Sequence, residues 1–282
     1  MLSSMYSGIS GLRNFQTKLD VIGNNIANVN TTGFKKGRTV FKDLMSQTVA
    51  GASGPGAGRG GVNPKQIGLG SQIATIDTIH SPGSPQFTGN TLDLAIAGDG
   101  YFQVLEGNEI MYTRAGNFSM DGNGDIVDSD GRYVQGVPKV NGVDGPVGKI
   151  TIPETASSMS IGQDGTVYFV DFPVGSDPDD PENKAVLQEA GQIQMAKFSN
   201  PSGLEKTGGN LYRASANSGV ALEGFALNQG FGTLQSGSLE MSNVDLAEEF
   251  TEMIVAQRGF QANTRIITTS DEILQELVNL KR

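Results

Sequence analysis

The strongest constraint in this sequence is a heptad pattern at its C-terminal end. Steps of seven residues from Leu246 pass through a wholly apolar row, which consists of Leu246, Met253, Phe260, Ile267 and Leu274. A second row is partly polar and consists of Phe250, Gln257, Thr264, Asp271 and Val278. This spacing predicts a coiled-coil-like helix of about 35 residues, which would be about 50 Å long. Such a helix needs partners beyond the core of one small domain.

Both ends of this predicted helix carry residues that suit a helix end. Asp245 stands immediately before Leu246, with Glu248 three residues further on, as in an N-terminal cap. Lys281 and Arg282 stand at the other end, where positive charge complements the helix dipole. We therefore expect the helix to begin at Leu246.

The N-terminal segment repeats the helical pattern less cleanly. Its apolar stripes are Leu2, Met5, Ile9 and Leu12, followed by Phe15, Leu19, Ile22, Ile26 and Val29. Gly8, Gly11 and Gly23 each weaken a helix by about 1 kcal/mol relative to alanine, so we expect this helix to stay disordered until it packs. A turn-rich stretch, residues 28–33, ends it, and the basic residues Lys35, Lys36 and Arg38 follow.

The middle of the chain has a different character from the two ends. All 11 prolines lie between Pro55 and Pro201, and residues 50–61 resemble a flexible glycine-rich linker. Between about residues 85 and 235, short apolar runs are separated by Asp-Gly pairs, which predict turns at Asp99, Asp121, Asp130 and Asp164. The expected fold class is α+β, in which paired terminal helices flank a mostly antiparallel β domain. We expect a terminal helical assembly domain (1–45 and 236–282), connecting segments (46–84 and 205–235) and a β-rich outer domain (85–204).

Charge and composition exclude several classes of protein. The net charge is −10, which argues against a nucleic-acid binder. The absence of cysteine excludes disulfides, thiolate nucleophiles and cysteine-based zinc sites. Residues 1–50 carry a net charge of +4 and residues 239–282 one of −4, so the two ends either attract each other or are ordinary solvated helix faces. We find no apolar run of membrane-spanning length and no cleavable signal pattern, so we expect neither.

Motifs that would carry enzymatic or cofactor chemistry are weak. Gly56–Gly61 fits the dinucleotide-binding pattern G-x-G-x-x-G but lies in the expected linker, without a strand before it or a helix after it. Asp121 opens a calcium-loop spacing that has Ile126 and Arg132 where glycine and glutamate are required. The only histidine, His80, lacks a carboxylate pattern nearby, and no spacing marks one pair among the 30 acidic residues. We expect no enzyme, cofactor or metal site, and interpret Asp177–Glu182 as an exposed acidic loop.

Several motifs resemble those of one family, the axial proteins of the bacterial flagellum, which are its rod and hook subunits. These motifs are the segments Ser7–Leu12, Val21–Lys35, Leu92–Gln103, Tyr112–Phe118, Met253–Asn263 and Ile273–Leu280. The C-terminal run after Gln257-Arg258 and the N-terminal Ser-Gly-Ile-Ser-Gly pattern look closest to a short hook protein. A basal-body distal rod protein is the alternative.

The resemblance implies a structural subunit whose terminal helices pair and pack into the inner tube of a helical assembly, with the β domain outside. As a hook subunit, it would form a flexible homopolymer that couples the rod to the filament. Its expected neighbours are the distal rod protein, the hook cap and the hook–filament junction proteins. The expected location is the flagellar hook or basal body, outside the cell, after unfolded export by the flagellar type III apparatus without a cleaved signal.

The resemblance and the heptad rows together indicate candidate self-assembly residues. These are Leu12, Ile22, Asn25, Ile26, Asn28, Phe34, Leu246, Phe250, Met253, Gln257, Phe260, Ile267, Leu274 and Val278. The polar seam residues Gln257, Thr264 and Asp271 have two interpretations. In the first, they fix the register between subunits or allow small sliding between them. In the second, they simply face solvent on a two-helix pair.

Overall fold

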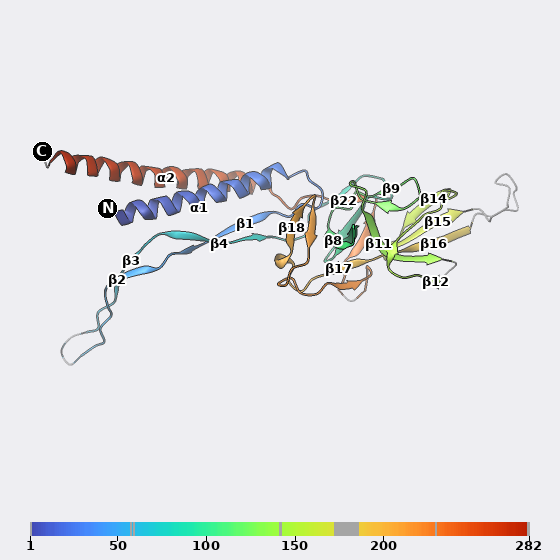
Figure 1. Cartoon of the computed structure of the whole chain (residues 1–282), viewed down its shortest axis with the longest axis horizontal. Helices are drawn as coiled ribbons and strands as arrows, with labels where there is room; N and C mark the ends of the chain where they lie inside the picture. The colour runs from blue at the N-terminus through green and yellow to red at the C-terminus, as the bar shows by residue number, and fades with distance from the viewer. Residues whose placement is uncertain are drawn as a thin grey trace. The chain divides into compact units, whose positions relative to one another are not determined.

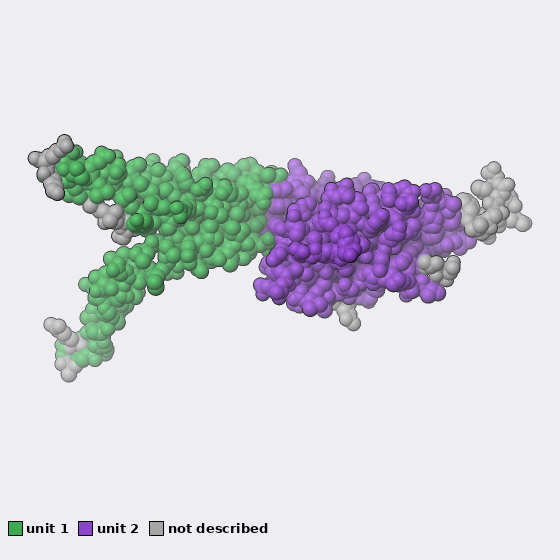
Figure 2. Space-filling view, in the orientation of Figure 1, with its two compact units in different colours: residues 1–27, 37–79, 244–282 green, residues 28–36, 80–243 purple. Residues whose placement is uncertain are grey.

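The structure, a computed structural model, describes residues 2–56, 58, 60–140, 143–171, 186–228 and 230–280. The chain divides into two compact units, which Figure 2 shows in separate colours. Unit 1 comprises residues 1–27, 37–79 and 244–282, and unit 2 comprises residues 28–36 and 80–243. The expected α+β class, with a helix at each end and mostly antiparallel strands between them, is confirmed. The predictions for the acidic loop at 177–182 and for Lys281 and Arg282 lie outside the described residues.

Unit 1 contains both long helices and two antiparallel ribbons. Its elements are α1 (Leu2–Ala27), β1 (Gly37–Asp43), β2 (Ser46–Ala50), β3 (Lys65–Gly68), β4 (Ser71–Thr78) and α2 (Leu246–Asn279). Within this unit α1 lies between α2 and the ribbon that β1 forms with β4 (Figure 1). The predicted start of α2 is confirmed, because the Asp245 carboxylate accepts hydrogen bonds from the backbone N–H groups of Ala247 and Glu248. The helix has 34 residues, close to the predicted length.

The glycine-rich segment at 50–61 belongs to a ribbon in its described part. Strands β2 and β3 pair antiparallel, and a further bridge joins Ser53 to Val62 beyond the ends of both strands. The expected linker is therefore largely the far part of a two-stranded ribbon. The glycine content of residues 50–61 does not predict this pairing, because the hydrogen bonds between β2 and β3 are made by residues on either side of the glycines.

Unit 2 consists almost entirely of short strands. They are β5 (Pro85–Phe87), β6 (Leu94–Ala97), β7 (Tyr101–Glu106), β8 (Glu109–Thr113), β9 (Ser119–Met120), β10 (Ile126–Val127), β11 (Tyr133–Val140), β12 (Val143–Asp144), β13 (Gly148–Lys149), β14 (Ser158–Ile161), β15 (Thr166–Asp171), β16 (Val186–Ile193), β17 (Met195–Lys197), β18 (Glu205–Gly208), β19 (Leu211–Arg213), β20 (Leu222–Gly224), β21 (Thr233–Ser236) and β22 (Ser238–Glu240). A short 3₁₀ turn, Pro201–Gly203, precedes β18. The main sheet has the order β14-β15-β16-β11-β7-β8-β19-β18, and its paired strands are antiparallel.

Three of the four predicted Asp-Gly turns connect strands that pair with each other. Those at Asp121, Asp130 and Asp164 join β9 to β10, β10 to β11 and β14 to β15. The turn at Asp99 is different, because β6 pairs with the distant β21 whereas β7 pairs with β8, β11 and β17. A local turn signal fixes where the chain reverses, but it does not fix which strand becomes the neighbour.

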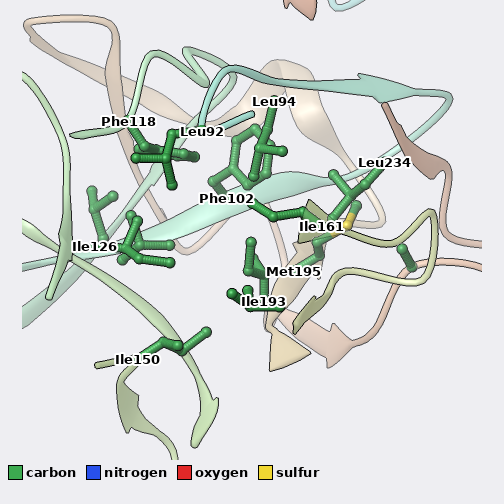
Figure 3. Close-up of a cluster of buried hydrophobic side chains, with 14 of the residues drawn as sticks. Leu92, Leu94, Phe102, Phe118, Ile126, Ile150, Ile161, Ile193, Met195 and Leu234 are labelled. Carbon is green, nitrogen blue, oxygen red and sulfur yellow. The ribbon is translucent and has the colours of Figure 1, made fainter. Parts of the chain in front are cut away.

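The main hydrophobic core lies inside unit 2. Figure 3 shows buried side chains from distant strands converging, among them Phe102, Ile193 and Leu234, each 0% exposed. Phe102 and Phe118 meet edge to face with ring centroids 5.1 Å apart. A smaller cluster on Tyr101, Tyr112, Phe198 and Tyr212 is aromatic. These clusters hold the strands on which the polar groups described below are mounted.

Candidate assembly interface

The two long helices pair antiparallel along most of their length. Near the start of α1, Gly8 faces Ile267 of α2, while near its end Asn25 donates a hydrogen bond to the Glu249 carboxylate at 3.1 Å. Between these points the Lys18 ammonium lies 2.7 Å from the Glu252 carboxylate. Residues near the start of α1 contact the later part of α2, and residues near the end of α1 contact its beginning. The last turns of α2 therefore extend past the beginning of α1.

One of the two predicted heptad rows faces α1. Met253, Ile267 and Leu274 are half-buried, and Phe260 in the same row keeps 37% of its surface exposed. The other row in contact consists of Glu249, Ala256, Asn263 and Ser270, each of which is buried or half-buried. These rows form one helix face, on which three residues of the predicted apolar row, Met253, Ile267 and Leu274, are half-buried, while Leu246 and Phe260 stay exposed.

The second predicted row is not part of the helix pair. Phe250, Gln257, Thr264, Asp271 and Val278 are all exposed, with Phe250 at 48% and Val278 at 67%. Within the single chain these side chains therefore face solvent, which is one of the two predicted interpretations, and their role between subunits stays a prediction. Within the chain the two helices meet instead through small and polar residues of α2 that stand one position earlier than this row.

Small residues bring the two helices close together. A Cβ atom built on Gly259 would lie 2.5 Å from Cζ of Phe15, and one on Gly11 would lie 2.8 Å from Oδ1 of Asn263. Such distances leave no room for a side chain at either position. The Phe15 ring in turn meets Phe41 of β1 edge to face, with ring centroids 6.0 Å apart. From the sequence we expected Gly11 only to weaken its helix. In the structure Gly11 and Gly259 permit the close packing of α1 on α2.

Asn25, one of the predicted residues, connects three segments of unit 1. Its side-chain amide donates to the Gly37 carbonyl at 2.9 Å, and its Oδ1 accepts from the Gly37 N–H at 2.9 Å. The same amide nitrogen donates to Glu249 of α2. With 2% of its surface exposed, Asn25 acts inside the unit and holds the start of β1 against both helices.

The remaining predicted residues occupy different environments. Ile22 is 4% exposed and belongs to the buried side of α1, whereas Leu12 and Ile26 are half-buried. Asn28 and Phe34 belong to unit 2, where the Asn28 side chain accepts from the Thr31 hydroxyl at 3.1 Å. The Phe34 ring is buried beneath the Lys206 ammonium, 5.0 Å from the ring centroid.

An exposed apolar surface remains on α2 after it has packed on α1. Besides Phe250 and Val278 it includes Leu246, Ile254, Val255, Ile266, Ile273, Leu277 and Leu280, which are between 39% and 82% exposed. Hydrophobic side chains that are exposed along most of one helix commonly mark a contact with another molecule. We use the name outer α2 surface for these nine residues.

The basic patch near residue 35 contains a buried ion pair that sequence spacing did not reveal. Lys35 is 0% exposed, and its ammonium lies 2.5 Å from Oε1 of Glu240, which also accepts from the Gly83 N–H at 2.9 Å. The other carboxylate oxygen of Glu240 lies 3.2 Å from Arg114. Burial lowers the pKa of Lys35, while Glu240 opposes that effect. Arg38 differs from Lys35, because it is exposed and lies 3.7 Å from Asp77.

The weak chemical motifs gain no support from the geometry. Asp121 and Asn123 lie in the β9–β10 turn, and the nearby Asp125 is bonded to Lys149 and Thr151. Within the part of the chain that the structure describes, no group of three or more histidine, aspartate or glutamate side chains is placed to hold a metal ion. No helix in that part is long and apolar enough to cross a membrane.

Three family models match successive parts of the sequence. Residues 5–35 match the family "Flagella basal body rod protein", and residues 95–169 match "Flagellar hook protein FlgE/F/G D1 domain". Residues 235–280 match "Flagellar basal body rod FlgEFG protein C-terminal". These matches include both long helices and the first half of unit 2.

Individual relatives match over the whole length of the chain. The flagellar basal-body rod protein FlgG of Bacillus subtilis is 60% identical over 286 residues, and FlgG of Borreliella burgdorferi is 38% identical over 287 residues. The flagellar hook protein FlgE of Borreliella burgdorferi is 32% identical over an alignment of 441 residues. Each alignment covers 100% of both proteins. The chain therefore belongs to the family of flagellar rod and hook proteins, the structural subunits of the flagellar axis.

Proposed function

We propose that this protein is the distal rod subunit of the flagellar basal body and assembles helically with copies of itself. The supporting observation is its 60% identity to the Bacillus subtilis rod protein over the full length of both chains. The hook protein of Borreliella burgdorferi aligns over 441 positions, far more than the 282 residues of this chain. The rod alternative from the sequence therefore replaces the hook as the preferred reading.

The motifs used to favour a hook protein lie in regions that also align with a rod protein. The rod-protein alignment includes the N-terminal Ser-Gly pattern and the run after Gln257-Arg258, because it spans the entire chain. Identity over the whole length, together with chain length, discriminates better between them.

The outer α2 surface supports the assembly part of the proposal. A repeated head-to-tail contact that does not close into a ring produces a helical polymer. Phe250 and Val278 belong to the exposed heptad row, and Phe260 belongs to the neighbouring apolar row. A helix of a second subunit that lies against Phe250 and Val278 would therefore also cover the exposed part of Phe260. Gln257, Thr264 and Asp271 would then lie at the contact between subunits and set its register.

The expected neighbours and route of export are part of the same proposal. A distal rod subunit would contact further copies of itself and, at its outer end, the hook protein. The hook cap and hook–filament junction proteins would be neighbours only of a hook subunit. We also propose that the protein is exported through the flagellar type III apparatus without cleavage of a signal. The intact mass of the protein from isolated flagella tests this, because cleavage would lower that mass.

A deletion strain distinguishes the rod from the hook. If the proposal is correct, basal bodies isolated from cells that lack this protein have shortened rods and carry no hook, and the intact gene restores both. Complete rods that end without hooks would assign the protein to the hook and overturn the rod assignment. Immunogold labelling of isolated wild-type basal bodies gives an independent position for the protein along the axis.

A further inference from the structure

A small cavity in unit 2 is lined by charged and aromatic side chains. Its volume is about 60 Å³, and its walls include His80, Asp99, Tyr101, Arg114, Lys197 and Phe198. This space is several times what one ordered water molecule requires. The cavity therefore has room for a small ion or a few waters.

Arg114, one of the residues that line this cavity, has an unused hydrogen-bond donor. Its two terminal nitrogens donate to the Gly98 carbonyl at 2.8 Å, the Ile96 carbonyl at 3.4 Å and the Glu240 carboxylate at 3.2 Å. Its third nitrogen, Nε, is buried and has no acceptor in the described part of the chain. Only 3% of the Arg114 side chain is exposed, so bulk water does not satisfy this N–H group.

His80 contributes a second unused donor. Its Nδ1 lies 2.7 Å from the hydroxyl of Tyr101. Burial raises the pKa of Tyr101 to about 12, so the hydroxyl keeps its hydrogen and is able to donate it to Nδ1. In the tautomer whose Nδ1 accepts this hydrogen bond, the ring proton of the neutral imidazole is on Nε2, which is buried and has no partner among the described residues.

The surroundings of the cavity carry more positive than negative charge. Lys35 and Arg114 share the single carboxylate of Glu240, and all three side chains are at most 3% exposed. Lys206 is exposed, so solvent screens its charge, and its ammonium donates to the Lys35 carbonyl. Burial first, and then the charges of Lys35 and Lys206, lower the pKa of His80. At the rim Lys197 pairs with Asp99 at 3.1 Å, and the Asp99 carboxylate is 70% exposed, so solvent screens its charge. Uncompensated buried positive charge is costly in free energy.

We propose that this cavity binds a small monovalent anion of halide size, which accepts hydrogen bonds from Arg114 Nε and His80 Nε2. An anion offers acceptors only, as the two unused donors require, and it also balances the excess of buried cations. A water molecule would satisfy the two donors but would leave the charge unbalanced. The site is separate from the outer α2 surface and does not depend on the assembly role.

Crystals of the full chain grown in sodium bromide give a direct test. The anomalous signal of bromide is expected to show a peak in the cavity, within hydrogen-bond distance of both Arg114 Nε and His80 Nε2. A cavity that contains only water, with no anomalous peak at high bromide concentration, overturns the proposal. The wild-type sequence is used, so this test does not depend on the folding of a variant.

Thermal unfolding of the unpolymerised chain tests the site in solution. At constant ionic strength, replacing gluconate, which is too large for the cavity, by bromide should raise the Tm by about 3 °C for each tenfold increase above the dissociation constant. His80→Phe keeps an aromatic ring but removes the Nε2 donor, and Lys197→Gln removes a cation at the rim. Both variants should lose at least half of the bromide-dependent rise.

A matched control separates site binding from general salt effects. Lys139 forms an exposed ion pair with Glu189 and does not line the cavity, so Lys139→Gln should keep the full bromide-dependent rise. An equal loss in Lys139→Gln and Lys197→Gln, or a wild-type Tm that does not distinguish bromide from gluconate, contradicts the proposal. If His80→Phe does not fold, Lys197→Gln alone carries the comparison.

Discussion

The ring of Phe15 occupies the space that a side chain at position 259 would need, with Cζ 2.5 Å from the ideal Cβ position. The same ring rests on Phe41 of β1, so it fills the junction between α2, α1 and the β1–β4 ribbon. This contact makes the packing of unit 1 sensitive to a single methyl group.

Gly259→Ala should therefore destabilise unit 1 by about 1–3 kcal/mol, because the Phe15 ring cannot move without losing its contact with Phe41. Gly23→Ala is the matched control, since nothing lies within 4 Å of its Cβ position in α1. That control should stabilise the protein by about 0.5–1 kcal/mol through helix propensity. Chemical unfolding followed by circular dichroism at 222 nm measures both, and equal effects of the two substitutions would contradict the packing described here.

Asn25→Ala should cost about 2–3 kcal/mol, because it removes the side-chain hydrogen bonds of the half-buried Gly37 N–H and carbonyl and one hydrogen bond of the Glu249 carboxylate. Gln16→Ala, at an exposed position of the same helix, should change the free energy of unfolding by less than about 0.5 kcal/mol. Unfolding in urea gives both values. A cost below that of the Gln16 variant would show that these hydrogen bonds contribute little.

Glu240→Gln should destabilise unit 2 by about 3–5 kcal/mol, because it leaves the buried cations Lys35 and Arg114 without a counter-charge. Glu109→Gln removes an exposed carboxylate from Arg213 and should cost less than about 1 kcal/mol. Differential scanning calorimetry compares the two variants, which differ in burial but not in the chemical change. The prediction fails if they unfold at the same temperature.

Acidification should weaken the fold through His80 before most carboxylates titrate. Burial lowers the pKa of His80 from 6.5 to about 4, so between these values the unfolded chain binds a proton that the folded chain does not. The free energy of unfolding should therefore be fully retained above pH 6.5 and fall as the pH drops towards 4. Since the chain has one histidine, His80→Phe should flatten this slope between pH 6.5 and 5, whatever its own stability. An unchanged slope in that variant would assign the pH dependence to other groups.

Phe250→Ser and Val278→Ser should leave the free energy of unfolding within about 0.5 kcal/mol of the wild type, because both side chains are exposed in the single chain. If the outer α2 surface forms the contact between subunits, each should raise the critical concentration for polymerisation at least about tenfold, or about 1.4 kcal/mol. Gln261→Ser, at another exposed position of α2, is the control. Sedimentation of nucleated polymer measures the effect, and normal polymerisation of both variants would remove this surface from the assembly.

Local sequence signals predicted the long elements well and the contacts between them less well. The start of α2, its length and the row through Met253 and Ile267 follow from capping and heptad spacing. The partner row through Ala256 and Ser270 was missed, because small and polar residues carry no hydrophobic signal although they allow helices to approach closely.

Contacts between distant segments were beyond the reach of spacing arguments. Lys35 and Glu240 are 205 positions apart, and nothing near either residue marks it as buried. The basic patch at residues 35–38 has the composition of a solvated surface, yet its first lysine is fully enclosed. Only the folded arrangement of unit 2 distinguishes Lys35 from Arg38.

The pairing of α1 with α2 also affects the order in which the parts of the chain fold. Asn25 and Glu249 touch although 224 positions separate them, and β1, β4 and the whole of unit 2 lie between them in the sequence. A contact with so large a sequence separation forms late in folding, and α1 alone, with three glycines, has little tendency to be helical. A newly emerging chain thus lacks the paired helices until α2 has followed, which delays premature association of subunits that are still incomplete.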